Sequence, residues 1–208
     1  MNESQTKLYR RAYLLSIVTI GYNLIEGVVA TILGFEDETL ALFGFGIDSF
    51  IEVMSGIGIA VMITRIRANP NSSKTEFEIR ALRVTGTAFY ILAVSLLAGV
   101  VLSIATGHTP ETTFWGVVIS SLSIATMLWL MTAKKRTGRK LNSEPIIADA
   151  NCTRICLYMS VVLLVSSLIY ELTGFAYADV IGAAALAWFS FSEGRESFEK
   201  AKGKSCCC

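Results

Sequence analysis

Two acidic residues inside a long apolar run are the first feature of the sequence that could do chemistry. Asp48 and Glu52 stand four residues apart within residues 44–54. In an α-helix this spacing places both carboxylates on one face, about 6 Å apart along the axis. A carboxylate at membrane depth is costly and usually marks an ion pathway or a pairing partner. We therefore expect this pair to belong to a site inside a membrane protein.

A second pair of chemically active residues repeats this spacing further along the chain. Cys152 and Cys156 are four residues apart, and Asp149 precedes Cys152 by three, so all three share one helical face. Two helices that each present such a pair can enclose a four-coordinate ion, as zinc-like ions prefer. The predicted metal ligands are Asp48, Glu52, Cys152 and Cys156.

Each half of this site also has a structural interpretation. Buried cysteines often act only as small packing residues. The two acids could instead bind Arg154, or Asn and Tyr side chains on other helices. The matched spacing in two segments favours the metal site.

The ligand types restrict the choice of metal. Sulfur ligands favour zinc, cadmium, mercury, lead or cuprous ions, and disfavour magnesium, calcium and manganese. A cage of two oxygens and two sulfurs therefore favours a soft or borderline divalent ion, with zinc or cadmium first and mercury or lead close behind. The residues do not choose among these ions. The metal is expected as cargo, and no cofactor is expected.

Charge balance at such a site suggests how transport is driven. Four deprotonated ligands around a divalent ion leave a net charge of about −2 in a low-dielectric interior, which is expensive. Either Arg154 compensates this charge or some ligands keep protons. Burial favours the protonated forms of carboxylates and thiols in an empty site, whereas metals bind the deprotonated forms. We therefore hypothesise metal–proton exchange by alternating access.

Further polar residues are candidates for auxiliary roles. Asn23 and Glu26 share a helical face, where they either hydrogen-bond to the metal ligands or simply hold helices together. Arg154 either extends to the cytoplasmic interface or pairs with Asp149, Glu52 or Glu26, and the ion pair is favoured. Near the chain end, a run of thiols could capture a thiophilic metal, carry a lipid or be incidental: Cys206, Cys207 and Cys208.

Long apolar segments must position these residues. The chain has 208 residues, of which 53% are hydrophobic, and a helix needs about 20 residues to cross a bilayer. This pattern predicts an all-α membrane protein, a bundle of six transmembrane helices. The expected segments are residues 12–35, 39–63, 80–106, 113–133, 145–172 and 176–192.

The distribution of basic residues predicts the orientation of this bundle. Lys and Arg gather before the first segment, in the second and fourth connections, and after the sixth segment, which places both termini in the cytoplasm. The fourth connection is expected to hold five of these basic residues: Lys134, Lys135, Arg136, Arg139 and Lys140. Residues 1–11 are then a cytoplasmic N-terminal segment, 12–199 the transport domain and 200–208 a cytoplasmic tail. A net charge of +1 gives no indication of nucleic-acid binding.

The second segment resembles the second transmembrane helix of the cation diffusion facilitators. The resemblance lies in Asp48, Ser49 and Glu52 after a run of small residues, and in Cys152 and Cys156 at the places of that family's fifth-helix ligands. It implies export of a divalent metal from the cytosol, by exchange with protons and as a homodimer. Asp48 and Glu52 then match the family's second-helix ligands.

The chain departs from the family's pattern in three respects. It lacks the usual cytoplasmic metal-binding domain after the sixth helix, so it resembles the short members that consist of the membrane domain alone. It lacks a His-rich loop, because His108 is the only histidine. Both fifth-helix positions are thiols. Without that domain, the resemblance does not predict the family's usual dimer contact or metal sensing for this chain. With two thiols, it does not predict the metal preference.

The sequence therefore predicts a multi-pass protein of the plasma membrane or the bacterial inner membrane that is a transporter and not an enzyme. One alternative is a membrane scaffold in which the polar residues only bind helices together. Another is a thiol oxidoreductase using Cys152 and Cys156, which is disfavoured because the usual redox spacing is Cys-x-x-Cys.

Overall fold

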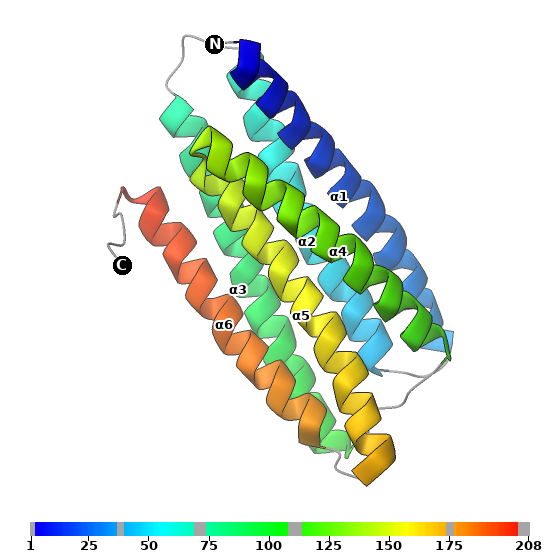
Figure 1. Ribbon diagram of the computed structural model, residues 1–208. Helices are drawn as coiled ribbons and strands as arrows, with labels where there is room; N and C mark the ends of the chain where they lie inside the picture. Colours follow the sequence, from blue (N-terminus) through cyan, green and yellow to red (C-terminus); the bar gives the residue numbers. More distant parts are fainter. Residues whose placement is uncertain (1–2, 37–39, 69–73, 108–113, 174–176, 204–208) are drawn as a thin grey trace.

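The protein is a bundle of six long helices, as predicted (Figure 1). The computed structural model describes residues 3–36, 40–68, 74–107, 114–173 and 177–203. All regular elements within these ranges are α-helices. Their bounds are α1 Glu3–Glu36, α2 Leu40–Ala68, α3 Lys74–Thr106, α4 Phe114–Leu141, α5 Glu144–Thr173 and α6 Tyr177–Ala201.

The distribution of side chains is that of a membrane protein. Among the described residues, four helices, α1 to α4, are long and apolar enough to cross a bilayer. Large apolar side chains point outward on α5 and α6 as well, as shown by Leu172 and Trp188, each 75% exposed. Acids, serines and threonines are instead buried among the helices. An apolar exterior around a polar interior is stable in lipid, so this is an integral membrane protein.

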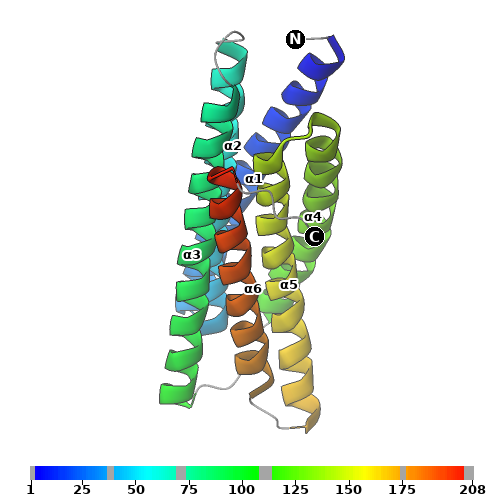
Figure 2. The same cartoon turned by 90° about the vertical axis from the view of Figure 1, so that its left-hand side faces the viewer.

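The helices form two groups, and α2 and α5 of the first group contact α3 and α6 of the second. One group holds α1, α2, α4 and α5, while α3 and α6 pack along each other at the side (Figures 1 and 2). The helices α2 and α5 contact each other in the centre. The two segments that carry the acid pair and the thiol pair are therefore neighbours.

The helices extend beyond the apolar segments at the end of the bundle where the basic residues gather. The beginning of α1, the end of α2 and the turn between α4 and α5 all lie at this end (Figure 1). That arrangement agrees with the charge pattern, although the orientation in the membrane stays a prediction.

The expectation that residues 134–140 belong to the fourth connection is wrong. The helix α4 continues to Leu141, and only Asn142 and Ser143 separate it from α5. Asn142 has a φ of 48°, and the Ser143 N–H donates to the Gly138 carbonyl at 3.1 Å. This is the left-handed ending that asparagine tolerates at a helix terminus. The reason for the longer helix is that part of this basic segment is buried in the bundle.

A close approach of α1 and α2 sets the position of the acid pair. A Cβ atom built on Gly46 would lie 2.7 Å from the Thr31 backbone nitrogen and 2.9 Å from the Gly27 carbonyl oxygen. Since backbone atoms cannot move aside as a flexible side chain can, any larger residue at this position must push the helices apart.

We expect the Gly46→Ala substitution to destabilise the protein by about 3 kcal/mol, because overpacking at a rigid contact is costly. Thermal unfolding in detergent micelles, followed by circular dichroism, would measure the effect. Gly21→Ala is the matched control, since a Cβ at Gly21 meets nothing within 4 Å. Equal melting temperatures for the two variants would contradict this account of the contact.

Candidate metal centre

The four predicted ligands all lie in the interior of the bundle. Asp48 and Glu52 on α2 are buried, and so are the free thiols of Cys152 and Cys156 on α5. Thr153, the neighbour of Cys152, donates to Glu52, and Ile51, the neighbour of Glu52, packs in one apolar cluster with Cys152. The two helices thus bring the acid pair and the thiol pair into one region.

Three oxygen atoms in this region have no hydrogen-bond partner within the described part of the chain. They are Asp48 Oδ1, Glu52 Oε2 and Asn23 Oδ1, and all three are buried. A buried acceptor without a partner is unfavourable, and few remain in folded proteins. Oxygens of this kind are ready to coordinate a cation.

These side chains do not form a closed cage in the present conformation. Among the described residues, no group of three or more His, Cys, Asp or Glu side chains is placed to hold one metal ion. Cys152 also packs in an apolar cluster with Phe89, Leu92 and Ile155, so it lies between the polar centre and the core. The ligand set itself stays a prediction.

A buried lysine, predicted from the sequence to lie in the fourth connection, occupies the space next to the acid pair. Lys134 on α4 is only 1% exposed. Its Nζ lies 2.9 Å from Asp149 Oδ2 and 3.6 Å from Glu52 Oε1. It also donates to Thr153 Oγ1 at 2.9 Å. The ammonium therefore has two close acceptors, Asp149 and Thr153, and a longer ion-pair contact with Glu52.

Hydroxyl groups complete this network around Asp149. Ser55 on α2 donates to Asp149 Oδ1 at 2.7 Å and lies 3.1 Å from the hydroxyl of Thr85. Since Lys134 binds the other oxygen, both carboxylate oxygens of Asp149 are used. Asp149 is thus the ion-pair partner of Lys134 in this conformation.

The two carboxylate oxygens of Glu52 have different surroundings. Its Oε1 accepts from the Thr153 hydroxyl and lies near Lys134, while its Oε2 has no hydrogen-bond partner in the described chain. Glu52 therefore belongs to both the ion-pair network and the candidate ligand set.

The sequence did contain a signal for the burial of Lys134. Residues at alternating spacings of three and four follow one face of α4, and they are buried: Ser123, Met127, Leu130, Lys134 and Thr137. Extending this stripe past the apolar run would have placed Lys134 inside. The polarity pattern by itself instead predicts a helix end where the charges begin.

Glu26 and Asn23 on α1 lie at the other side of the acid pair. Glu26 accepts from Tyr22 at 2.9 Å and from Ser49, the neighbour of Asp48, at 3.0 Å. Asn23 donates to the Thr19 carbonyl at 3.0 Å. Glu26 therefore links α1 to α2 next to the site. The side-chain carbonyl oxygen of Asn23 has no hydrogen-bond partner among the described residues.

Arg154 pairs with an acid on α6 that is not among its predicted partners. Its guanidinium lies 2.9 Å from Glu193 Oε1 on α6, and Asn151 donates to the second oxygen at 2.8 Å. The guanidinium also lies 5.0 Å from the centre of the Phe189 ring. Arg154 follows Cys152 by two residues, about 200° around the helix, and so faces α6. The cation beside the acid pair is Lys134 and not Arg154.

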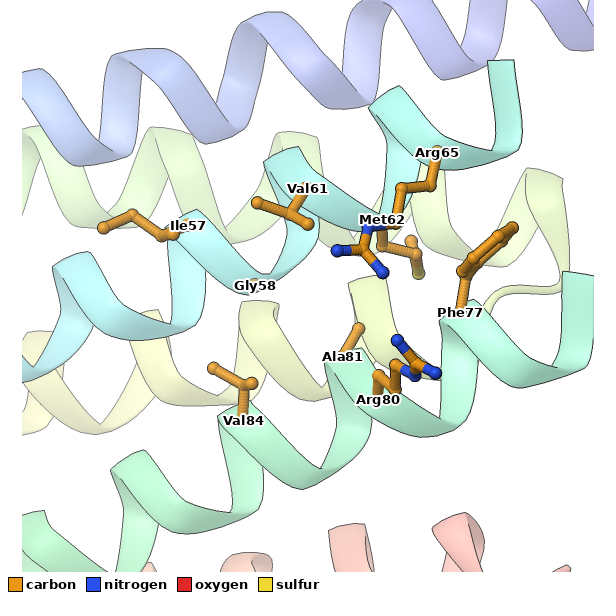
Figure 3. Close-up of a pocket in the computed structure, with 9 residues that line it drawn as sticks. All are labelled: Ile57, Gly58, Val61, Met62, Arg65, Phe77, Arg80, Ala81 and Val84. Atoms are coloured by element: carbon orange, nitrogen blue, oxygen red, sulfur yellow. The ribbon is translucent and has the colours of Figure 1, made fainter. Parts of the chain in front are cut away.

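Two other features lie apart from this centre. The predicted metal-capturing thiols Cys206, Cys207 and Cys208 are outside the described residues. A cavity of about 220 Å³ between α2 and α3 is lined mainly by apolar side chains, with Arg65 and Arg80 at its edge (Figure 3). It contains none of the four candidate ligands.

Two comparisons with known proteins each cover most of the chain. Residues 12–202 match the family model for the cation efflux transmembrane domain. A protein described as an uncharacterized transporter of Methanocaldococcus jannaschii is 28% identical over 176 residues, which cover 82% of this chain and 62% of the relative. The chain thus spans less than two thirds of the length of this relative. The family match extends over all six helices, and we conclude that the chain belongs to the cation efflux, or cation diffusion facilitator, family.

Proposed function

We propose that the protein transports a soft or borderline divalent cation through the centre between α2 and α5. The observation that carries this proposal is a pair of buried acids whose oxygens Asp48 Oδ1 and Glu52 Oε2 lack hydrogen-bond partners among the described residues. These acids lie on α2, which packs against α5 with its two buried free thiols. Membership of the cation efflux family supports it. Asp48, Glu52, Cys152 and Cys156 supply the ligands, with zinc or cadmium as the first candidates and mercury or lead next.

The residues of the centre also support coupling to protons. Among the described residues, no cation outside the Lys134 network forms an ion pair with Asp48 or with either thiol. In a buried site with no metal bound, such groups favour their protonated forms, and a metal ion must displace those protons. We therefore propose efflux by metal–proton antiport. The homodimer stays a prediction.

Transport into proteoliposomes tests the proposed function. With the interior acidified, we expect zinc and cadmium uptake several-fold faster than without a pH gradient, and little uptake of magnesium, calcium or manganese. Fluorescent or radioactive metal probes would measure the rates. Uptake that ignores the pH gradient would contradict antiport, and equal uptake of magnesium would contradict the role of the thiols.

The scaffold alternative is favoured by one observation, the complete satisfaction of Asp149 by Lys134 and Ser55. Such a network can hold helices together without any transport. Asp48 distinguishes the two functions, since a helix-binding role does not explain an oxygen without a partner. No metal uptake by the intact, correctly folded protein would favour the scaffold.

A further inference from the structure

We propose that the Lys134 ammonium partly neutralises the acids of the site when no metal is bound, as the positive charge of the metal does when the site is filled. Its ammonium holds Glu52 and Asp149, and a divalent ion that binds Glu52 must compete with it. This inference rests on the proposed function, because it describes how the same site binds and releases its metal. Lys134 is thereby a positioning residue and not a ligand.

The geometry allows the ammonium to move away from Glu52 and remain paired with Asp149. Nζ is closer to Asp149 Oδ2, at 2.9 Å, than to Glu52 Oε1, at 3.6 Å. Asp149 is fixed from the other side by Ser55, at 2.7 Å, so it can retain the ammonium alone. Glu52 can then turn both oxygens to a metal while Lys134 stays paired. The long, flexible lysine stem suits such a small shift.

Charge balance supports the same inference. In the metal-free centre, Asp48, Glu52 and Asp149 with Lys134 carry a formal charge of −2 while the thiols keep their protons, whereas the three carboxylates alone carry −3. Without the ammonium, three carboxylates would share a buried region with no described cation among them. With it, the metal-free centre has less uncompensated charge to bury.

Electrostatics also predicts the consequence for affinity. A fixed positive charge a few ångströms from a bound divalent ion repels it strongly in a site of low dielectric. The ammonium should therefore weaken metal binding and speed release. A purely structural ion pair predicts the reverse, because breaking it would disturb Glu52 and weaken binding.

Two substitutions with opposite expected effects test this role. Zinc binding to the purified full-length protein in nanodiscs can be measured by titration calorimetry. In Lys134→Met we expect the Kd for zinc to fall about tenfold or more, since the competing charge is gone. In Asp149→Asn we expect the Kd to rise, because Lys134 is left with Glu52 as its only carboxylate. In proteoliposomes Lys134→Met should lower both the KM and the maximal rate, because release becomes slow.

The double variant Lys134→Met/Asp149→Asn keeps the test decisive if Lys134→Met alone does not fold. It should bind zinc about tenfold or more tightly than Asp149→Asn. Weaker binding in both single variants, or a double variant that binds no better than Asp149→Asn, would overturn the inference. Failure of the unmodified protein to bind zinc, cadmium, mercury or lead would instead contradict the proposed function.

Discussion

Replacing Asp48 with asparagine is expected to reduce zinc uptake by about a hundredfold or more while leaving the fold intact. The amide keeps the shape of the side chain but removes the negative charge that a buried divalent ion requires. Asp48 Oδ1 has no hydrogen-bond partner within the described chain, so folding does not depend on it. The melting temperature should stay the same or rise, since the amide carries no charge that must be buried at this position.

Uptake into proteoliposomes and thermal unfolding of the same preparation would measure both effects. The matched control is Glu76→Gln, which neutralises an exposed acid that pairs with Arg80 on the surface of α3. It should transport at the rate of the unmodified protein. A correctly folded Asp48→Asn variant with unchanged uptake would remove Asp48 from the metal centre.

The second large effect is expected from the thiols. Replacing Cys152 or Cys156 with serine should lower zinc and cadmium uptake about tenfold or more, with cadmium affected most. The reason is that a hydroxyl is a harder and much weaker ligand than a thiolate for soft ions. Selectivity should shift toward manganese and magnesium, because an all-oxygen site suits hard cations. Competition between cadmium and manganese in the uptake assay would measure this shift.

Alanine at the same positions separates ligation from packing. Cys152 lies in an apolar cluster with Phe89 and Leu92, so a packing role predicts that Cys152→Ala transports well and Cys152→Ser less well. A ligand role predicts that both variants lose soft-metal uptake. Full uptake by Cys152→Ala with the metal preference unchanged would show that the thiol is a packing residue.

Local periodicity was sufficient to predict the fold and the two halves of the candidate site. A run of apolar residues of membrane-spanning length must become a helix in lipid, because every backbone polar group needs an internal partner. Within such a helix, a spacing of four residues places Asp48 and Glu52 on one face whatever surrounds them. The same is true of Cys152 and Cys156. Six helices and two paired faces therefore follow from the chain itself.

The boundary of α4 could not be placed from polarity alone. Charged residues after an apolar run usually mark the membrane surface, and residues 134–140 fit that rule. The helix nevertheless continues, with Lys134 and Thr137 buried on the stripe of Met127 and Leu130. Whether a basic residue at such a boundary faces solvent or the bundle depends on which acids the neighbouring helices present to it.

Sequence alone thus determined that this protein spans a membrane, with two acids on one face of one helix and two thiols on one face of another, and from these pairs it predicted a metal site. Only the tertiary structure decided which cation accompanies them. Arg154 and Lys134 are both basic residues near the same end of the bundle, but the phase of α5 turns Arg154 to Glu193 on α6, whereas the phase of α4 turns Lys134 to Glu52 and Asp149. The rotation of each helix relative to its neighbours depends on packing between residues far apart in the chain, and local spacing carries no information about it.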